Sequence, residues 1–319
     1  MKHYAFIDYA TQGYLAVVGL LILLFHGSAI PFWPWLLAAH AAGITLVHAL
    51  IRSHARRPAN RVLDFLRHFY PVILYVGFYR ETGELNQMFT TGYLDPIFIR
   101  LDETIFSVQP SLAFMQSLPY WPISEILYAS YFSYYVMIVG IGVALFVRNR
   151  SQFFHFVSVV SFVFYVCYLV YIFTPVMGPR IFHRTINGYS LPMDVQPPII
   201  PEFPAAVQAG LFFRIMAWIY ETFEAPGAAF PSSHVTVALT TLWFSFRYLP
   251  RIRFLHLVTA VLLCLSTIYC RYHYAVDVMA GIVTAAVLVP LGNWLYARSC
   301  PQLVDPSPGL QPPSPHRMG

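Results

Sequence analysis

The chain has 319 residues, of which 58% are hydrophobic and 10% charged, and its formal net charge is +5. Soluble domains carry about 25% charged residues, so this composition argues against a soluble protein and indicates that lipid surrounds much of the chain. The arginines stand in short clusters between apolar runs, a pattern that does not indicate nucleic-acid binding. We therefore predict an all-α polytopic membrane protein with no nucleic-acid partner.

The N-terminal region is an apolar run that is too long for one membrane helix. From Tyr9 to Ile51 there is no Asp, Glu, Lys or Arg, and the segment 31–34, which contains two prolines, interrupts the run. A bilayer core requires about 20 helical residues, so we predict two spans, at about 10–29 and 33–51. No convincing small-residue cleavage site is present, so the first run is expected to remain as a span and not to be removed as a signal peptide.

Six further spans follow, which makes eight in total. The first of them, at 65–80, is the weakest because arginines frame a short apolar run. The others are predicted at 126–147, 153–174, 234–249, 254–270 and 276–297. Eight spans place both termini on one side, and that side receives 13 of the 19 lysine and arginine residues. The positive-inside rule then predicts cytoplasmic termini, so that the loops at 81–122 and 175–233 lie on the extracytoplasmic or lumenal face.

Three regions are expected along the chain. Residues 1–63 form two N-terminal transmembrane helices and a basic cytoplasmic loop. Residues 64–297 form a six-helix membrane core with the long outer loop 175–233, in which 205–223 regains a helical pattern and is expected at the membrane surface. Residues 298–319, rich in proline and serine, are predicted to be a disordered cytoplasmic tail. None of the four cysteines makes a CxxC pair, so neither a disulfide framework nor a thiolate metal site is expected.

Three clusters of polar residues fall on the outer side of this topology. They are the segments 178–180 after the fifth span, 230–234 at the start of the sixth, and 271–277 between the seventh and the eighth. The topology comes from hydropathy and charge alone, so the meeting of the three clusters at one face supports a single site there.

Each cluster has a chemical logic. His273 and Asp277 are four residues apart and share one face of a helix, so the carboxylate can orient the imidazole and leave its other nitrogen free to attack. Ser232 and Ser233 stand before a helix, and a helix N-terminus is a ready anion site. His234 at that N-terminus is able to protonate a leaving oxygen.

Two arginines complete the set of candidates. Arg180 and Arg271 can neutralise phosphate oxygens as charge develops. Structural roles are the alternatives: an ion pair for His273 with Asp277, a headgroup anchor for Arg180, and a helix cap for Ser233. A metal site made by His273, Asp277 and His234 is a further alternative, although no acidic cluster accompanies these residues.

The three clusters resemble the motifs of the type-2 phosphatidic acid phosphatase superfamily, which are Lys-x6-Arg-Pro, Pro-Ser-Gly-His and Ser-Arg-x5-His-x3-Asp. The first motif is matched by Arg180, with Phe173 in place of the lysine. The second has a serine in place of its glycine and is matched at Pro231, Ser232, Ser233 and His234. The third has a threonine in place of its arginine and is matched at Ser266, Thr267, His273 and Asp277.

The resemblance implies a role for each residue. His273 would be the nucleophile that forms a phosphoenzyme, Asp277 would orient it, and His234 would be the general acid. The phosphate-binding residues would be Arg180, Ser232, Ser233 and Arg271. The chemistry would need no metal and no cofactor, and the last six helices would form the helical core of the superfamily.

The resemblance also implies a reaction. The sequences Gly-Pro-Arg and Arg-Tyr-His-Tyr-x-Val-Asp look closest to the branch of inositol-phosphorylceramide synthases and sphingomyelin synthases. We expect a membrane enzyme that moves a phosphoryl group or phospho-headgroup from a phospholipid, sphingolipid or polyprenyl phosphate to water, as a lipid phosphatase. Transfer to a lipid alcohol is one alternative, and a catalytically inactive lipid-binding or transport relative is another.

Overall fold

The computed structural model describes residues 3–180 and 203–299. This part of the chain contains twelve α-helices and, apart from one isolated bridge between Val176 and Ala228, no β-structure. The predicted all-α fold is therefore confirmed. Most of the predicted tail at 298–319 lies outside the described residues, and the part of it that is described continues the last helix.

Each of the eight predicted spans is a helix. They are α1 (Phe6–Phe25), α2 (Trp33–Arg56), α3 (Arg61–Leu85), α6 (Trp121–Arg148), α7 (Arg150–Phe173), α10 (Ser233–Tyr248), α11 (Arg253–Tyr269) and α12 (Ala275–Ser299). Within the described residues, five helices are long and apolar enough to cross a membrane, namely α1, α2, α6, α7 and α12. That finding supports an integral membrane protein, and the count of eight spans stays a prediction.

The outer loops contain helices of their own. The loop at 81–122 forms α4 (Asp95–Phe106) and α5 (Pro110–Ser117), neither of which the sequence analysis predicted. The predicted helical stretch at 205–223 is present as α8 (Ala205–Gln208) and α9 (Leu211–Phe223). Only Met216 of α9 is buried, so this helix lies against the bundle by one narrow face.

Helix boundaries follow local sequence signals. Asn149 ends α6 and caps α7, because its side chain accepts hydrogen bonds from the backbone of Ser151 and Gln152. Asn60 caps α3 in the same way, through the backbone of Val62 and Leu63. Such caps satisfy backbone N–H groups that have no partner within the helix, so each short link defines the start of the next helix.

Helix α7 is the centre of the bundle. It packs against α1, α3, α6, α10 and α12, and most of its residues are buried. The N-terminal pair α1 and α2 is fastened to this core by a buried cluster, in which Asp8 pairs with Arg67 and accepts a hydrogen bond of 2.7 Å from the hydroxyl of Tyr70. Removing one partner of a buried ion pair costs about 3–5 kcal/mol, so this cluster joins α1 firmly to α3.

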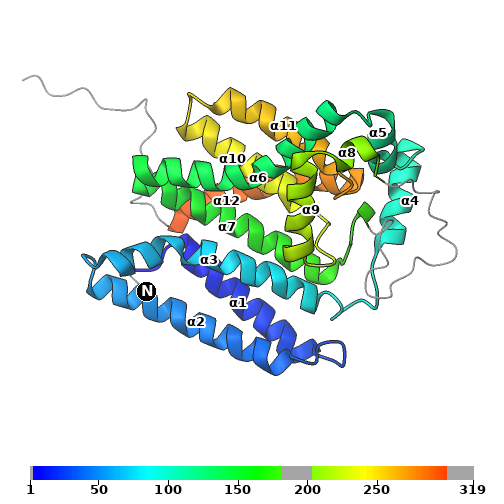
Figure 1. Cartoon of the computed structure of the whole chain (residues 1–319). Coiled ribbons are helices and arrows are strands. Elements are labelled where there is room, and N and C mark those ends of the chain that lie inside the picture. The colour runs from blue at the N-terminus through cyan, green and yellow to red at the C-terminus, as the bar shows by residue number, and fades with distance from the viewer. Residues whose placement is uncertain (1–2, 181–202, 300–319) are drawn as a thin grey trace, which may run out of the picture.

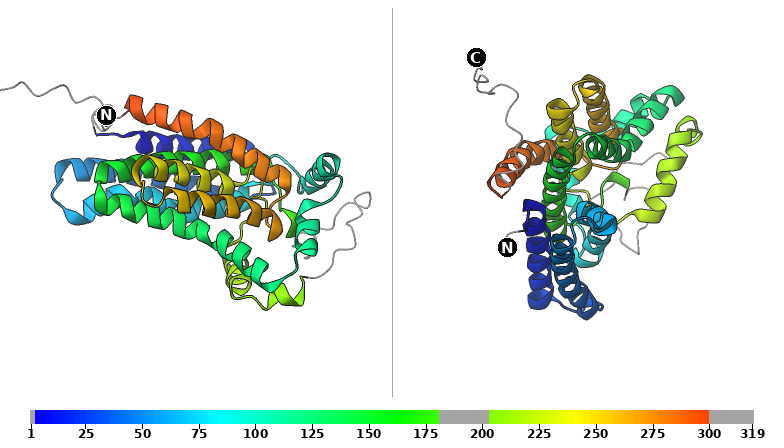
Figure 2. Two further views of the ribbon diagram at one scale, coloured as in Figure 1. Left: turned by 90° about the horizontal axis from the view of Figure 1, so that it is seen from above. Right: turned by 90° about the vertical axis from the view of Figure 1, so that its left-hand side faces the viewer.

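The ends of the bundle differ. The beginning of α1 and the end of α12 lie at one end, and α4, α5, α8 and α9 gather at the other (Figures 1 and 2). The loops that carry the three predicted clusters also lie at the second end, beside these short helices. The fold therefore brings segments about 100 residues apart in sequence to one end of the helices.

Candidate active site

The segment that carries His273 begins where α11 ends. Arg271 has a φ of 61°, the left-handed conformation that commonly ends a helix. The backbone N–H of Arg271 donates to the carbonyl of Ile268, and that of Tyr272 donates to the carbonyl of Thr267. This hydrogen-bond pattern turns the chain sharply before α12, so that His273 is held between two helices at the end of the bundle.

His273, His234 and Asp277 come together as predicted. The Nδ1 atom of His273 lies 3.5 Å from the Oδ2 atom of Asp277. The Nε2 atom of His273 lies 3.3 Å from the Nδ1 atom of His234. When Nδ1 of His273 carries the proton toward the carboxylate, Nε2 keeps its lone pair and faces the second histidine. The geometry therefore fits an oriented nucleophile beside a proton donor.

His273 is held in its neutral form. Its side chain is 3% exposed, and burial lowers the pKa of His273 to about 4. At neutral pH the imidazole is therefore uncharged, which is the form that can attack phosphorus. Asp277 is fully buried, and its Oδ2 atom also accepts a hydrogen bond of 2.9 Å from the backbone of Tyr274, which fixes the carboxylate beside the histidine.

The N-terminus of α10 is built as a compact turn. Ser232 is its N-cap, with a side chain that accepts a hydrogen bond of 3.3 Å from the backbone of Val235. The backbone N–H of Ser232 donates to the carbonyl of Asp277 over 3.2 Å, which ties the start of α10 to α12. A helix cap was the structural alternative expected for Ser233. In the structure Ser232 is the N-cap, and Ser233 is the first residue of the helix.

The segment 175–180 lies directly against the His273 loop. Gly178 has a φ of 89°, and a Cβ atom at this position would lie 2.5 Å from the carbonyl oxygen of Tyr272. Only glycine permits so close an approach of the two backbones. The guanidinium of Arg180 lies 4.7 Å from the ring centre of Tyr220 and 4.9 Å from that of Tyr272. Its Nη1 atom is buried without a hydrogen-bond partner among the described residues, which leaves a donor for an anion.

Arg271 is also placed by this loop, but differently. Its side chain is fully buried, and its guanidinium lies 4.9 Å from the ring centre of Phe203. Its predicted role in phosphate binding stays a prediction. The threonine that replaces the motif arginine, Thr267, donates to the carbonyl of Cys264 in its own helix, so its hydroxyl is engaged in α11.

Aromatic residues of α6 and α9 enclose the site, and the sequence analysis missed this role. The rings of Tyr131 and Tyr134 lie 5.0 Å and 4.4 Å from the imidazole of His234. The hydroxyl of Tyr131 is hydrogen-bonded to that of Tyr220, which stacks on Tyr272 at 3.9 Å. Tyr128, Tyr131 and Tyr134 of α6 were not among the predicted site residues. Their three-residue spacing, which puts them on one helix face, was the available signal.

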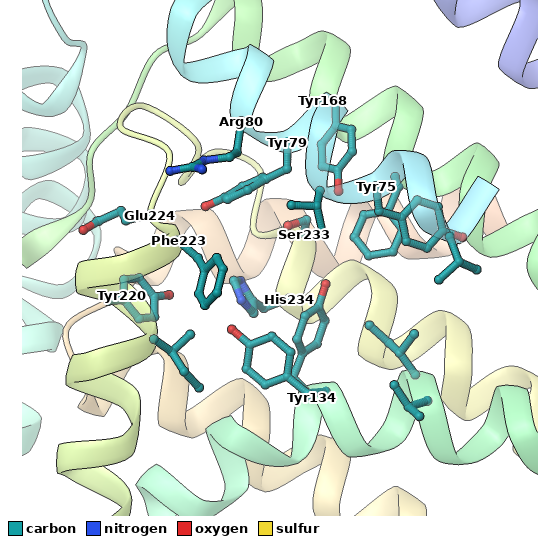
Figure 3. Close-up of a pocket in the computed structure, with 17 residues that line it drawn as sticks. Tyr75, Tyr79, Arg80, Tyr134, Tyr168, Tyr220, Phe223, Glu224, Ser233 and His234 are labelled. Carbon is teal, nitrogen blue, oxygen red and sulfur yellow. The ribbon is translucent and has the colours of Figure 1, made fainter. Parts of the chain in front are cut away.

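A cavity of about 380 Å³ is lined in part by Ser233 and His234 (Figure 3). Apolar and aromatic residues of α3, α6, α7 and α9 make most of its wall, including Val76, Ile138 and Phe164. In the close-up the imidazole of His234 points into this space among the side chains of Phe223, Tyr134 and Ser233. An apolar cavity with a few polar groups in its wall is the usual form of a small-molecule site.

In the described part of the chain there is no group of three or more His, Cys, Asp or Glu residues placed to hold a metal ion. The expected metal independence of the chemistry stays a prediction.

Comparisons with known proteins identify the family of the chain. The family model described as "PAP2 superfamily" matches residues 98–291, more than half of the chain, and includes all three clusters. A "PA-phosphatase related-family protein" of Dictyostelium discoideum is 22% identical over 120 residues, a stretch that covers 37% of this chain and 19% of the relative. No solved structure matches the chain. The extent of the family match, which takes in the predicted motif residues, shows that the chain belongs to the PAP2 superfamily.

Proposed function

We propose that this protein is a membrane enzyme that transfers a phosphoryl group from a lipid phosphate to water, through a phosphohistidine at His273. The observation that carries the proposal is the pair of nitrogens of His273 and His234, 3.3 Å apart, with Asp277 on the other side of His273. The two imidazoles are neighbours at one site, so a phosphoryl group that enters between them and separates the rings can be attacked by His273 while His234 protonates its leaving oxygen. Membership of a superfamily of phosphatases, and the name of the Dictyostelium relative, support this reaction class.

The proposed reaction has two steps. Nε2 of His273 attacks phosphorus, a P–N bond forms, the P–O bond to the alcohol breaks, and His234 gives its proton to the leaving oxygen. Water then attacks the phosphohistidine, His234 takes the proton from that water, and phosphate leaves as His273 is restored. Asp277 stabilises the Nδ1 proton of His273 during both steps.

Four residues are proposed to bind the phosphate: Arg180, Ser232, Ser233 and Arg271. The N-terminus of α10 adds backbone N–H groups and the positive end of the helix dipole, which favour an anion there. The negative charge of the bound phosphate in turn favours the protonated form of His234, which the first step requires.

The apolar cavity supports a lipid as the substrate. Because His234 lines it and most of its wall is made of apolar residues of α3, α6 and α7, it can hold hydrocarbon beside the reacting phosphate. The chemical class is a phospholipid, sphingolipid or polyprenyl phosphate. The positive-inside rule and the position of α4, α5, α8 and α9 opposite the start of α1 support an active site on the extracytoplasmic or lumenal face, with cytoplasmic termini.

Transfer to a lipid alcohol, as in inositol-phosphorylceramide synthases, is the second candidate. The observation that favours it is the enclosure of the site. His273 is 3% exposed, and the ring of Tyr220 stacks on that of Tyr272, which directly precedes His273. A site that limits water gives a bound alcohol more time to attack the phosphohistidine.

The deciding experiment uses purified protein in lipid vesicles. Labelled phosphatidic acid, a polyprenyl phosphate and an inositol phospholipid are each supplied with and without ceramide. Free phosphate supports the phosphatase, and a new phospholipid supports the transferase. A label on His273 that is stable to alkali and lost in acid supports the phosphohistidine.

The variant His273→Asn is expected to abolish activity and labelling, whereas His26→Gln, at an exposed histidine after α1, should change neither. Full activity of folded His273→Asn would contradict the mechanism. A wild-type protein that is inactive on every lipid and does not bind vanadate, a mimic of the phosphoryl transition state, would favour the inactive lipid-binding or transport relative.

A further inference from the structure

Two aspartates of helix α4 face the interior of the protein. Asp95 and Asp102 are both 0% exposed, and Phe98 and Ile99 between them are 7% and 2% exposed. These four positions follow the spacing of one helix face, and the next residue, Glu103, is exposed. Aspartates in a long outer loop are normally solvated. Asp95 and Asp102 are completely buried instead, and their hydrogen bonds explain why they are inside.

Asp95 joins two of the three site segments. Its carboxylate accepts hydrogen bonds of 2.9 Å from the backbone N–H groups of Met177 and Gly178, two residues before Arg180. It also accepts a hydrogen bond of 3.0 Å from the hydroxyl of Tyr274, which directly follows His273. One carboxylate on α4 therefore fixes the Arg180 segment relative to the His273 loop.

Asp102 holds the beginning of α12. Its two carboxylate oxygens accept hydrogen bonds of 3.0 Å each from the backbone N–H groups of Ala275 and Val276. Those groups belong to the first turn of the helix and would otherwise lack partners within it. A carboxylate at this position also interacts favourably with the positive end of the helix. Asp277 is the next residue, so Asp102 sets the place of the carboxylate that orients His273.

The apolar part of the same face reaches the third segment. The ring of Phe98 lies 4.8 Å from the ring of Phe230, which immediately precedes the Pro-Ser-Ser-His sequence. The same ring stacks on Tyr274 at 6.2 Å. Phe98 and Ile99 belong to one buried cluster with Val176, Ala229 and Val276. The inward face of α4 thus contacts all three segments that carry the proposed catalytic and phosphate-binding residues.

We propose that Asp95 and Asp102 are positioning residues, which fix the three site segments relative to one another through backbone hydrogen bonds from α4. This inference rests on the proposed function. Catalysis depends on the distances among His273, His234 and Arg180, and a displacement of about 1 Å can cost on the order of 100-fold in rate. Neither aspartate touches the reacting atoms, so both act through the backbone that they hold.

The test compares Asp102→Asn and Asp95→Asn with the matched control Glu103→Gln. An asparagine oxygen can accept a bond from one N–H group, but its amide cannot accept from the second, so part of the restraint is lost. We expect kcat to fall about 10- to 100-fold in each aspartate variant. KM should be nearly unchanged in Asp102→Asn, because Asp102 holds the beginning of α12 and not the Arg180 segment that binds phosphate. The kcat of Asp102→Ala should be lower than that of Asp102→Asn, and the kcat of Glu103→Gln should match that of the wild type.

A second measurement does not depend on activity. Hydrogen exchange of the 271–277 segment is expected to be about 10- to 100-fold faster in Asp102→Asn, because hydrogen bonds to a charged acceptor are lost, while exchange in α7 stays unchanged. Unchanged protection of this segment would overturn the proposal, as would wild-type kcat in a folded aspartate variant. Faster exchange together with a wild-type protein that never labels His273 would overturn the proposed function and leave the structural role of α4 in place.

Discussion

The Nε2 atom of His273 lies 3.3 Å from the Nδ1 atom of His234, although the two residues are 39 positions apart in the chain. On the other side of the same ring, the Nδ1 atom of His273 lies 3.5 Å from the Oδ2 atom of Asp277. The neighbouring carboxylate is therefore beside His273 and not beside His234. The two imidazoles are therefore not equivalent, since a carboxylate lies beside one and the other points into the cavity. This difference assigns them separate chemical roles that experiments can distinguish.

The proton-donor role of His234 predicts a dependence on the leaving group. The variant His234→Asn should lower kcat on a phosphate ester of an ordinary lipid alcohol by about 10²- to 10⁴-fold, because the alkoxide then leaves without a proton. A p-nitrophenyl phosphate ester needs no proton on its leaving group. With it, phosphorylation of His273 should proceed at nearly the wild-type rate, and the phosphoenzyme should accumulate because the second step lacks its base.

Rapid-quench measurement of phosphoenzyme against time checks this prediction. His273→Asn serves as the control and should form no phosphoenzyme with either ester. Equal losses of His234→Asn on both esters would show that His234 is not the proton donor.

The low pKa of His273 predicts a pH profile. Burial lowers this pKa to about 4, so the nucleophile stays neutral well below the ordinary histidine pKa of about 6.5. In His234→Asn with the p-nitrophenyl ester, kcat/KM for phosphoenzyme formation is divided by the fraction of the ester in its reactive ionisation state. The corrected profile should be flat from about pH 8 to about pH 5 and fall with a midpoint near 4. A midpoint near 6.5 would mean that the imidazole is not held in its neutral form.

The same pKa has a consequence for stability. Between about pH 6.5 and pH 4 the unfolded chain binds a proton at this histidine that the folded protein does not bind. The contribution of His273 to folding therefore becomes less favourable as the pH falls through this window. Unfolding temperatures measured across the window should decline less steeply in His273→Asn than in the wild type, and identical slopes would contradict the assignment.

Much of the fold was predictable because hydrophobicity is a local signal. The eight apolar runs all became helices, and the three polar clusters met at one end, as the topology predicted. The site depends on less local information. Arg271 adopts a left-handed conformation that the sequence would assign to glycine, and this turn aims His273 at His234.

Helix α4 was missed for a physical reason. Aspartates normally face water, so Asp95 and Asp102 in the long outer loop give no indication of a buried helix face. They are buried because backbone N–H groups from segments 82 and 173 positions away along the chain meet them, and a single sequence does not reveal those pairings. The spacing of Asp95, Phe98, Ile99 and Asp102 is typical of one helix face. Hydrophobicity alone could not show that the two aspartates of this face are buried together with Phe98 and Ile99.

Close backbone contact predicts that Gly178 is irreplaceable. In Gly178→Ala the new Cβ atom would lie 2.5 Å from the carbonyl oxygen of Tyr272, at a φ of 89° that other residues rarely adopt. The left-handed conformation alone costs about 1–2 kcal/mol, and the contact adds to it. Thermal unfolding in detergent should show the loss of stability. The control Gly140→Ala, with open space around an exposed position of α6, should be neutral or stabilising, and equal stability of the two variants would contradict the contact.

The Nη1 atom of Arg180, which has no hydrogen-bond partner within residues 3–180 and 203–299, predicts a role in binding the phosphoryl group. Arg180→Gln should weaken inhibition by orthovanadate by about 10- to 100-fold, because a hydrogen bond between charged groups is lost. Arg214→Gln is the matched control, since this arginine is exposed on α9. Inhibition curves for the two variants check the prediction, and equal inhibition would limit Arg180 to packing against Tyr220 and Tyr272.

The cavity between α3, α6 and α7 predicts that chain length matters to the substrate. Ile138 lines the cavity, and Ile138→Trp would fill part of its volume of about 380 Å³. The KM for a long-chain phosphatidic acid should rise and kcat/KM should fall, because hydrocarbon that the cavity would shelter from water is displaced, at about 0.8 kcal/mol for each CH₂ group. A short-chain or p-nitrophenyl ester, which needs little of the cavity, should be affected much less.

Val143→Trp provides the control for this change. Val143 is on the same helix, is 54% exposed and does not line the cavity, so the added indole meets lipid and not the substrate. The ratio of kcat/KM for long-chain and short-chain esters is the quantity to compare, because any general effect of a tryptophan on folding cancels in it. If that ratio is the same in both variants and in the wild type, the hydrocarbon of the substrate lies elsewhere and the cavity is not its site.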